Sequence, residues 1–243
     1  MSQLRVLLTG PSGRIGPHIV PTFEECFDLH TFDLTPSSRP NSHVGSLQDL
    51  ESLRAAMKGI DVVVHLAATS DEAPFLEQLV PNNIEGLYNL MTAAQLEGVR
   101  RVVFASSVQA SWHLLQDAEK NEQPVETDVH SSCSLYGVTK VFGEVLGQYY
   151  HHHHNIEFVG IRLGWFERVE NIRPNNWINN VWISPNDAAQ LFKKAAEVPN
   201  VGFAIINGTS KTPKELLSLK SARELLNYDP QDFVREPEPV ACG

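Results

Sequence analysis

The sequence has few cysteines, few basic residues and no long apolar run. Its 243 residues include three cysteines that are far apart and not in metal-ligand spacing, Cys26, Cys133 and Cys242. We therefore expect a reducing compartment rather than a disulfide framework. Lysine and arginine number 19 against 29 acidic residues, and the resulting charge of −10 argues against nucleic acid or an anionic membrane surface as a partner. No apolar stretch approaches the roughly 20 residues of a membrane span, and the start has no signal-peptide pattern. The expectation is a cytoplasmic protein that binds a small molecule.

What the chain does contain is an alternation of apolar runs with amphipathic segments. Strands are predicted at 4–8, 26–32, 61–68, 100–107 and 156–164, and helices at 46–58, 76–97 and 136–150. The apolar runs lack polar alternation, which is typical of parallel strands that are buried on both faces. The sequence therefore predicts an α/β fold with a doubly wound parallel sheet, known as a Rossmann fold.

The first strand-to-helix turn reads TGPSGRIG, with Gly10, Gly13 and Gly16 spaced three residues apart. Glycines let backbone amides approach a pyrophosphate, and the amino terminus of the next helix adds a favourable dipole. Asp33 ends the second strand, where a carboxylate binds adenosine ribose hydroxyls and repels a 2′-phosphate. The pattern favours NAD over NADP, with the nearby Arg39 acting against that preference. A simple tight turn is the alternative explanation of the glycines.

The alternation becomes less regular after Gly164. The segment 165–183 is polar, Asn-rich and aromatic, and a helix at about 185–197, the strand GFAIIN and a helical end follow it. This remainder is too short for an independent domain. We expect residues 1–164 to form an NAD-binding domain and residues 165–243 to form a small substrate-binding lobe over the carboxyl edge of the sheet.

A tyrosine and a lysine stand four residues apart in SLYGVTK, at the start of a predicted helix. Tyr136 and Lys140 therefore share one helix face, close to the strand end FASS at the ligand-binding edge of the sheet. Because free tyrosine has a pKa of about 10, a base that works near neutrality needs a neighbouring cation, which Lys140 supplies. Ser107 would hold the reacting oxygen. The alternative is ordinary helical spacing without a function.

Five motifs together resemble the extended short-chain dehydrogenase/reductase family, also called the NAD-dependent epimerase/dehydratase family. They are TGPSGRIG at 9–16, DVVVHLAA at 61–68, NNIEGLYNLMTAA at 82–94, FASS at 104–107 and YGVTK at 136–140. The resemblance covers nearly the whole chain. Within the family, the chain is most similar to uronate dehydrogenases and related archaeal sugar dehydrogenases. Those enzymes use NAD to oxidise the anomeric carbon of a free sugar acid or aldose.

The resemblance implies a role for each matching residue. Tyr136 would be the general base, Lys140 its electrostatic partner, and Ser107 the partner of the substrate hydroxyl. The implied NAD-binding residues are Gly10, Ser12, Gly13, Arg14, Ile15, Gly16, Asp33, Ser46, Leu47, Leu66, Ala67, Ala68, Asn83, Tyr136 and Lys140. The implied substrate-binding residues are Ser70, Ser107, Gln109 and Arg173.

Departures from the family pattern concentrate on the substrate side. Uronate dehydrogenases usually have Ser-Asn-His where this chain has Ser107, Val108 and Gln109. Their arginine clamp for the substrate carboxylate is replaced by Ile178, which leaves Arg173 as the nearby cation. The residues for hydride transfer are retained despite these changes, whereas the identity of the substrate does not follow from the resemblance.

Three functions are compatible with these features. We prefer an NAD-dependent dehydrogenase of a free sugar or sugar acid, because the short tail leaves little protein to hold a nucleotide sugar. A nucleotide-sugar epimerase and a non-catalytic NAD-binding sensor are the alternatives. The resemblance also suggests a homodimer that pairs the helices at 76–97 and 136–153, although their apolar positions could instead all face the sheet.

Several other residues have structural explanations. The four histidines 151–154 suit the dipole at a helix carboxyl end, and adjacent residues point in different directions, so we expect no metal site. His65 is expected in the core. Asn83 would brace the active-site backbone or cap a helix. Four tryptophans either line a sugar pocket or pack in the protein, Trp112, Trp165, Trp177 and Trp182.

Overall fold

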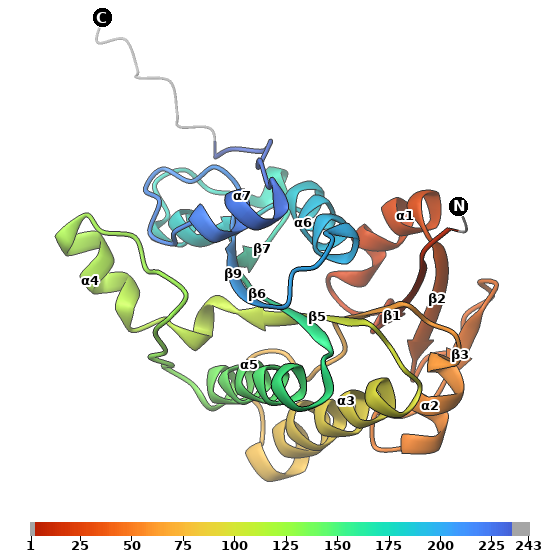
Figure 1. Cartoon of the computed structure of the whole chain (residues 1–243). Helices are drawn as coiled ribbons and strands as arrows, with labels where there is room; N and C mark the ends of the chain where they lie inside the picture. The colour runs from red at the N-terminus through yellow and green to blue at the C-terminus, as the bar shows by residue number, and fades with distance from the viewer. Residues whose placement is uncertain (1–2, 235–243) are drawn as a thin grey trace, which may run out of the picture.

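Seven parallel strands form the central sheet of the computed structural model, which describes residues 3–234 (Figure 1). Their order across the sheet is β3-β2-β1-β4-β5-β6-β9. The strands are β1 (Arg5–Thr9), β2 (Asp28–Asp33), β3 (Ser42–Val44), β4 (Val62–His65), β5 (Arg101–Ser107), β6 (Glu157–Leu163) and β9 (Phe203–Gly208). Strand order reverses between β1 and β4, and this switch point leaves a crevice at the carboxyl ends of both strands. The doubly wound α/β fold predicted from the sequence is confirmed.

Helices cover both faces of the sheet. One layer contains α1 (Gly16–Cys26), α6 (Pro185–Glu197) and α7 (Lys220–Leu226), and the other contains α2 (Leu50–Met57), α3 (Gly86–Leu96) and α5 (Leu135–His154) (Figure 1). The first layer encloses a core around Phe23 and Phe192, and the second encloses one around Met57 and Phe158. The near-continuous apolar strands are thus buried from both sides, as a parallel sheet requires.

Two helix boundaries differ from the prediction for local reasons. α2 begins at Leu50 rather than near Ser46, because the Asp49 carboxylate accepts hydrogen bonds from the amides of Glu51 and Ser52, both at 3.1 Å. α5 continues four residues beyond the expected end at Tyr150, so the four histidines form its last turn. Asn155, with a left-handed φ of 55°, then ends the helix.

The predicted long helix at 76–97 consists of two helices of different winding. Its first half is η1 (Phe75–Glu85), a π-helix that continues directly into α3. Pro81 lies inside η1, and its carbonyl accepts a hydrogen bond from the amide of Gly86, five residues later. The wider winding is a feature that hydrophobic periodicity does not reveal.

Several short elements were not predicted. They are β3, the helix α4 (Leu114–Asn121), the strand pair β7 (Trp165–Phe166) and β8 (Trp182–Ile183), and the 3-10 turns η2 (Val108–Ala110), η3 (Val169–Asn171) and η4 (Trp177–Val181). Each is too short or too polar for a periodic apolar pattern to mark it. Among the helices of residues 3–234, none is both long and apolar enough to cross a lipid bilayer.

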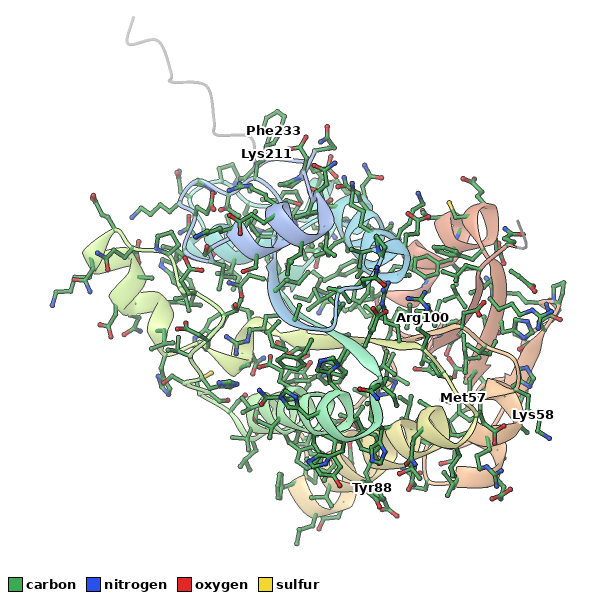
Figure 2. The ribbon with its side chains drawn as sticks, viewed as in Figure 1. Met57, Lys58, Tyr88, Arg100, Lys211 and Phe233 are labelled. Atoms are coloured by element: carbon green, nitrogen blue, oxygen red, sulfur yellow. The ribbon has the colours of Figure 1, made fainter. Side chains whose placement is uncertain are left out.

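The segment after Gly164 joins the same architecture. β9 pairs with β6 in the main sheet, and α6 packs against α1. Farther along, the backbones of Lys211 and Phe233 form an isolated parallel β-bridge, and Figure 2 shows the two residues close together beside α7. The division into an NAD-binding domain and a small lobe at Gly164 stays a prediction, and its last nine residues, including Cys242, lie outside the described part of the chain.

Candidate active site

A cavity of about 520 Å³ opens at the carboxyl edge of the sheet. It lies at the switch point between β1 and β4, where doubly wound folds bind ligands. Most of the residues predicted for the site line it, namely Gly10, Ser12, Gly13, Arg14, Ile15, Asp33, Ser46, Leu47, Leu66, Ala67, Ala68, Ser70, Ser107, Gln109, Tyr136 and Lys140. Three do not, namely Gly16, Asn83 and Arg173. The fold therefore brings segments far apart in the sequence to one place.

The glycine-rich turn lies directly against the end of β4. Gly10 has a φ of +74°, and a Cβ atom there would come within 2.8 Å of the backbone of Ala67. A Cβ on Gly16 would lie 2.5 Å from the Pro11 carbonyl oxygen, so Gly16 serves the packing of the turn rather than the cavity wall. The turn presents backbone and no bulky side chain at the start of α1, which fits a dinucleotide pyrophosphate.

Asp33 is held at the end of β2 by the turn itself. Its Oδ2 accepts hydrogen bonds from the Ser12 amide at 3.0 Å and the Ser12 hydroxyl at 2.7 Å, and its Oδ1 accepts one from the Thr35 amide at 3.0 Å. Burial raises the pKa of Asp33, but hydrogen bonds from Thr35, Ser12 and Leu34 together bring it below the usual value. The carboxylate is thus charged at neutral pH. Arg39 is engaged elsewhere, since its Nε lies 3.1 Å from Glu24.

Ser46 and Leu47 close the same end of the cavity. The Ser46 hydroxyl donates a hydrogen bond to Gln48 at 2.5 Å, and the Leu47 carbonyl accepts one from the Asn89 side chain at 3.1 Å. The loop before α2 is therefore anchored both within itself and to α3.

Tyr136, Lys140 and Ser107 meet where α5 begins beside the end of β5. Ser134 caps α5 by accepting a hydrogen bond from the Gly137 amide at 2.9 Å, which fixes the first turn that carries Tyr136. The Lys140 Nζ lies 5.4 Å from the centre of the Tyr136 ring and donates a hydrogen bond to the Ala105 carbonyl at 2.8 Å. The helical spacing of the pair thus places the amine against the phenol ring.

Burial changes the protonation of this pair in opposite directions. It raises the pKa of Tyr136 to about 12, with the charge of Asp71 acting in the same sense and the Ser107 hydroxyl against it. It lowers the pKa of Lys140 to about 7, against the charge of Glu144, which raises it. Burial thus places the pKa of Tyr136 above its ordinary value, and the expectation that Lys140 brings this pKa down stays a prediction. The cost of burying a phenolate is the largest cause of the raised pKa.

A buried ion pair lies one helical turn beyond Lys140. Glu144 is 2% exposed and Arg162 0% exposed, and two hydrogen bonds of 2.9 and 2.8 Å join them. Glu144 also accepts a hydrogen bond from Ser106 at 2.5 Å, and Arg162 donates one to the Val129 carbonyl at 2.9 Å. The pair ties α5 to β5, to β6 and to the loop that leads into Tyr136.

Asn83 and His65 support the cavity from below. Asn83 accepts a hydrogen bond from the Thr69 amide at 2.8 Å and donates to the Thr69 carbonyl at 3.0 Å and to Thr139 at 3.1 Å. It braces the backbone of the cavity wall. Its side chain does not line the cavity. His65 is buried, and its Nδ1 lies 2.7 Å from the Thr9 hydroxyl. Burial, and secondarily the charge of Lys140, lowers its pKa to about 3.

The structure adds wall residues that the sequence did not mark. Asp71 lines the cavity, with a φ of 61°, and directly after it the Glu72 carboxylate accepts a hydrogen bond from the Tyr136 amide at 3.1 Å. The acidic pair in the stretch TSDEAP after β4 was the available signal. Arg173 is exposed, and its side chain does not reach the cavity wall.

The four tryptophans divide between the two expected roles. Trp112 and Trp165 line the cavity. Trp177 packs edge-on against Trp112 and donates its Nε1 hydrogen to Glu119 at 2.7 Å. Trp182 is fully buried and donates to the Glu167 carbonyl at 2.7 Å. Within residues 3–234, the four histidines included, no group of side chains is arranged to hold a metal ion.

Comparison with known proteins agrees with this geometry. The family model described as the NAD dependent epimerase/dehydratase family matches residues 6–167. The chain belongs to this family. The family, the enzyme class and the NAD dependence predicted from the motifs are thereby confirmed.

Three similar proteins illustrate the range within the family. The NAD-dependent glucose-6-phosphate dehydrogenase of Haloferax volcanii is 32% identical over 97% of both chains. The L-arabinose 1-dehydrogenase (NAD(P)(+)) of the same organism is 29% identical, over 94% of this chain and 96% of its own. The crystal structure of uronate dehydrogenase from Agrobacterium tumefaciens superposes with a TM-score of 0.82 at 29% identity, covering 100% of this chain and 93% of that one.

Proposed function

We propose that this chain is an NAD-dependent dehydrogenase that oxidises the C1 hydroxyl of a free sugar or sugar acid. The observation that carries the proposal is the presence of Tyr136, Lys140 and Ser107 in one cavity with a glycine-rich turn and a charged Asp33. The names of the relatives, a sugar-phosphate, an aldose and a uronate dehydrogenase, support a sugar as the substrate.

The residues of the cavity fit NAD. Gly10, Gly13 and Ser12 would hold the pyrophosphate, Asp33 the adenosine ribose, and Lys140 the nicotinamide ribose. When bound, NAD accepts the hydride that leaves the sugar carbon. The carboxylate of Asp33 disfavours a 2′-phosphate at the ribose, which selects NAD over NADP.

The chain itself supplies the proton chemistry. The Ser107 hydroxyl orients the sugar hydroxyl toward Tyr136, and the phenolate form of Tyr136 takes the proton from that hydroxyl. The ammonium form of Lys140, whose Nζ lies 5.4 Å from the centre of the Tyr136 ring, would stabilise the phenolate. Because the pKa of Tyr136 is about 12 and that of Lys140 about 7, the form with a phenolate and an ammonium, and with it turnover, is expected to increase with pH up to about 7 and then to level off.

The proposal is tested by measuring NADH formation with neutral aldoses, uronates and sugar phosphates. Net NADH formation with at least one of them is expected. An epimerase would convert a nucleotide sugar with no net NADH, and a sensor would bind NAD without turnover. Either result would reject the dehydrogenase function in favour of the corresponding alternative.

We also propose a cytoplasmic homodimer that pairs α3 and α5 with their copies. Apolar side chains on the outer sides of these helices are exposed, with Tyr88 at 52% and Val145 at 55%. Figure 2 shows Tyr88 on the side of α3 that faces away from the sheet. The free cysteines Cys26 and Cys133 agree with a reducing compartment.

Light scattering tests the dimer. A dimeric mass for the protein and a monomeric mass for Val145→Asp are expected, because a buried charge would disrupt an apolar interface. A monomeric mass for the unmodified protein at micromolar concentration would reject the dimer.

A further inference from the structure

The charged residues of the cavity wall fall into two pairs. Arg14 and Asp33 stand beside the glycine-rich turn, and Asp71 and Lys140 stand beside Tyr136. The wall therefore holds two cations, and a sugar carboxylate or phosphate would need one of them as its partner.

Both cations already have partners within the protein. The Arg14 guanidinium donates a hydrogen bond to the Phe166 carbonyl at 2.7 Å and lies 3.4 Å from the Glu167 carboxylate. Lys140 is buried and donates to the Ala105 carbonyl, and burial lowers its pKa to about 7. Lys140 therefore offers no exposed charge to an anionic sugar, and Arg14, which is 54% exposed, stands in the glycine-rich turn with its Nη2 already engaged.

Asp71 has the opposite character. Its side chain is exposed, it lines the cavity, and within residues 3–234 it forms no hydrogen bond and no ion pair. Its charge acts on the reacting end of the cavity, because it contributes to the raised pKa of Tyr136. An anionic group on the substrate would meet this unneutralised carboxylate.

Apart from these four charged residues, the lining of the cavity is uncharged. Trp112, Trp165 and Ile178 offer apolar surface, which suits the apolar faces of a sugar ring. Thr69, Ser70, Asn82 and Gln109 also line the cavity with groups that hydrogen-bond to hydroxyls. Ile178 adds no charge to the wall.

We propose that the substrate is an uncharged aldose and that Asp71 excludes sugars that carry a carboxylate or a phosphate. This inference rests on the proposed dehydrogenase function. Asp71 acts as a specificity residue through its charge and takes no part in the hydride or proton transfer.

The first experiment compares matched sugars with the unmodified enzyme. NADH formation is measured with glucose, glucuronate and glucose 6-phosphate, and with galactose and galacturonate. The kcat/KM of the neutral sugars should exceed that of their anionic counterparts by about tenfold or more, since a charge without a partner is poorly bound in a partly closed site. An equal or higher kcat/KM for an anionic sugar overturns the inference while leaving the dehydrogenase in place.

The second experiment removes the charge of Asp71. Asparagine tolerates the left-handed φ of this position, so Asp71→Asn keeps the backbone. The ratio of kcat/KM for glucuronate to that for glucose should rise about threefold to tenfold, and less at high salt. The ratio is used because the loss of this charge also lowers the Tyr136 pKa for every substrate.

Glu224→Gln is the matched control for the loss of one negative charge. Glu224 is exposed on α7, does not line the cavity and has no partner in the described part of the chain. It should leave the ratio unchanged. An unchanged ratio in Asp71→Asn, or an equal change in Glu224→Gln, rejects the role of Asp71.

A binding measurement separates this inference from the proposed function. Tyr136→Phe, saturated with NAD, is titrated with glucose, glucuronate and glucose 6-phosphate in a calorimeter. Tighter binding of glucose than of either anion supports an uncharged substrate. If the enzyme then turned over none of these sugars, the dehydrogenase function would be refuted and the preference for an uncharged sugar would stand. Tighter binding of either anion overturns the inference.

Discussion

The two halves of the cavity are fixed to the protein in different ways. The glycine-rich half, which comprises Gly10, residues 12–15, Asp33 and residues 66–68, is held by backbone contacts such as the hydrogen bond from the Gly10 amide to the Phe32 carbonyl at 3.0 Å. The loop half, which comprises residues 69–71, Gln109, Trp112, Trp165 and Ile178, lies on loops and on the short elements η2, β7 and η4, and it includes the exposed residues Ser70 and Asp71. The contrast indicates that the sheet dictates the chemistry, whereas the loops determine which molecule undergoes it.

Removal of the Tyr136 hydroxyl, at the junction of the two halves, should have the largest effect. Tyr136→Phe should lower kcat by about a thousandfold, because the general base is lost. NAD affinity measured by calorimetry should change by less than about threefold if the glycine-rich half binds independently. Tyr149→Phe, on the exposed side of the same helix, is the control and should keep full turnover. Undiminished turnover in Tyr136→Phe would reject the assignment.

The ion pair of Glu144 and Arg162 should carry much of the rigidity with which α5 is held against the sheet. Glu144→Gln leaves the fully buried Arg162 without a carboxylate and should lower the free energy of unfolding by about 3–5 kcal/mol. Urea denaturation measures the loss. The exposed pair of Glu24 and Arg39 is the comparison, and Glu24→Gln should cost less than about 1 kcal/mol. Similar losses in both variants would show that burial of the pair is unimportant.

His65 should make the stability of the glycine-rich half depend on pH. Its folded-state pKa of about 3 lies below the ordinary value of 6.5, so the unfolded chain takes up a proton first as the pH falls. Stability from this residue is therefore full above pH 6.5 and decreases between pH 6.5 and pH 3. Between pH 6.5 and pH 5 the loss should be about 2 kcal/mol. Urea titrations at both values should show a smaller loss for His65→Asn, and an equal loss would contradict the prediction.

A comparison of two glycines with the same backbone conformation distinguishes the effect of backbone strain from that of steric contact. Gly10 and Gly98 have φ values of +74° and +73°, but only Gly10 has neighbours within 4 Å of an added Cβ. Both alanine variants should lose about 1–2 kcal/mol of stability from the left-handed conformation. Only Gly10→Ala should also weaken NAD binding, by about tenfold, because the turn must move away from Ala67. Calorimetry with NAD would contradict this result if both variants bound alike.

The smallest effect is expected in the loop half. Trp112→Leu should raise the KM for the sugar by about threefold to tenfold through the loss of aromatic surface. NAD affinity should stay the same, since Trp112 is not part of the glycine-rich half. Steady-state kinetics with each substrate varied in turn measures both quantities. A weakened NAD affinity would show that the two halves are coupled.

The sequence was sufficient for the glycine-rich half because its signals are local. Gly10, Gly13, Asp33 and the Tyr136–Lys140 pair are recognisable by short spacings at the ends of predicted strands and helices, and all line the cavity. The loop half follows from tertiary placement, which local spacing does not encode. Arg173 was assigned to it from its neighbours in the chain, but the residue is exposed and outside the wall.

The pKa values of the site could not be predicted from local spacing for the same reason. Helical spacing places Lys140 beside Tyr136, but it does not reveal how completely both side chains are removed from water. Asp71 was missed because an acidic residue in a polar stretch has no periodic signal. Asn83 was predicted as a brace, and its partner Thr69 became known only from the fold.

The winding of η1 fixes the number of residues between Pro74 and Gly86. Asn82 and Asn83 are neighbours in this helix, and both bond to Thr69, one to its hydroxyl at 2.8 Å and the other to its backbone. A π-helix holds one residue more per turn than an α-helix. Loss of a single residue from η1 would rotate every preceding side chain by about 100° about the axis, away from its present partners. Alignments of homologues should therefore show gaps in the loops on either side of this helix and none within it.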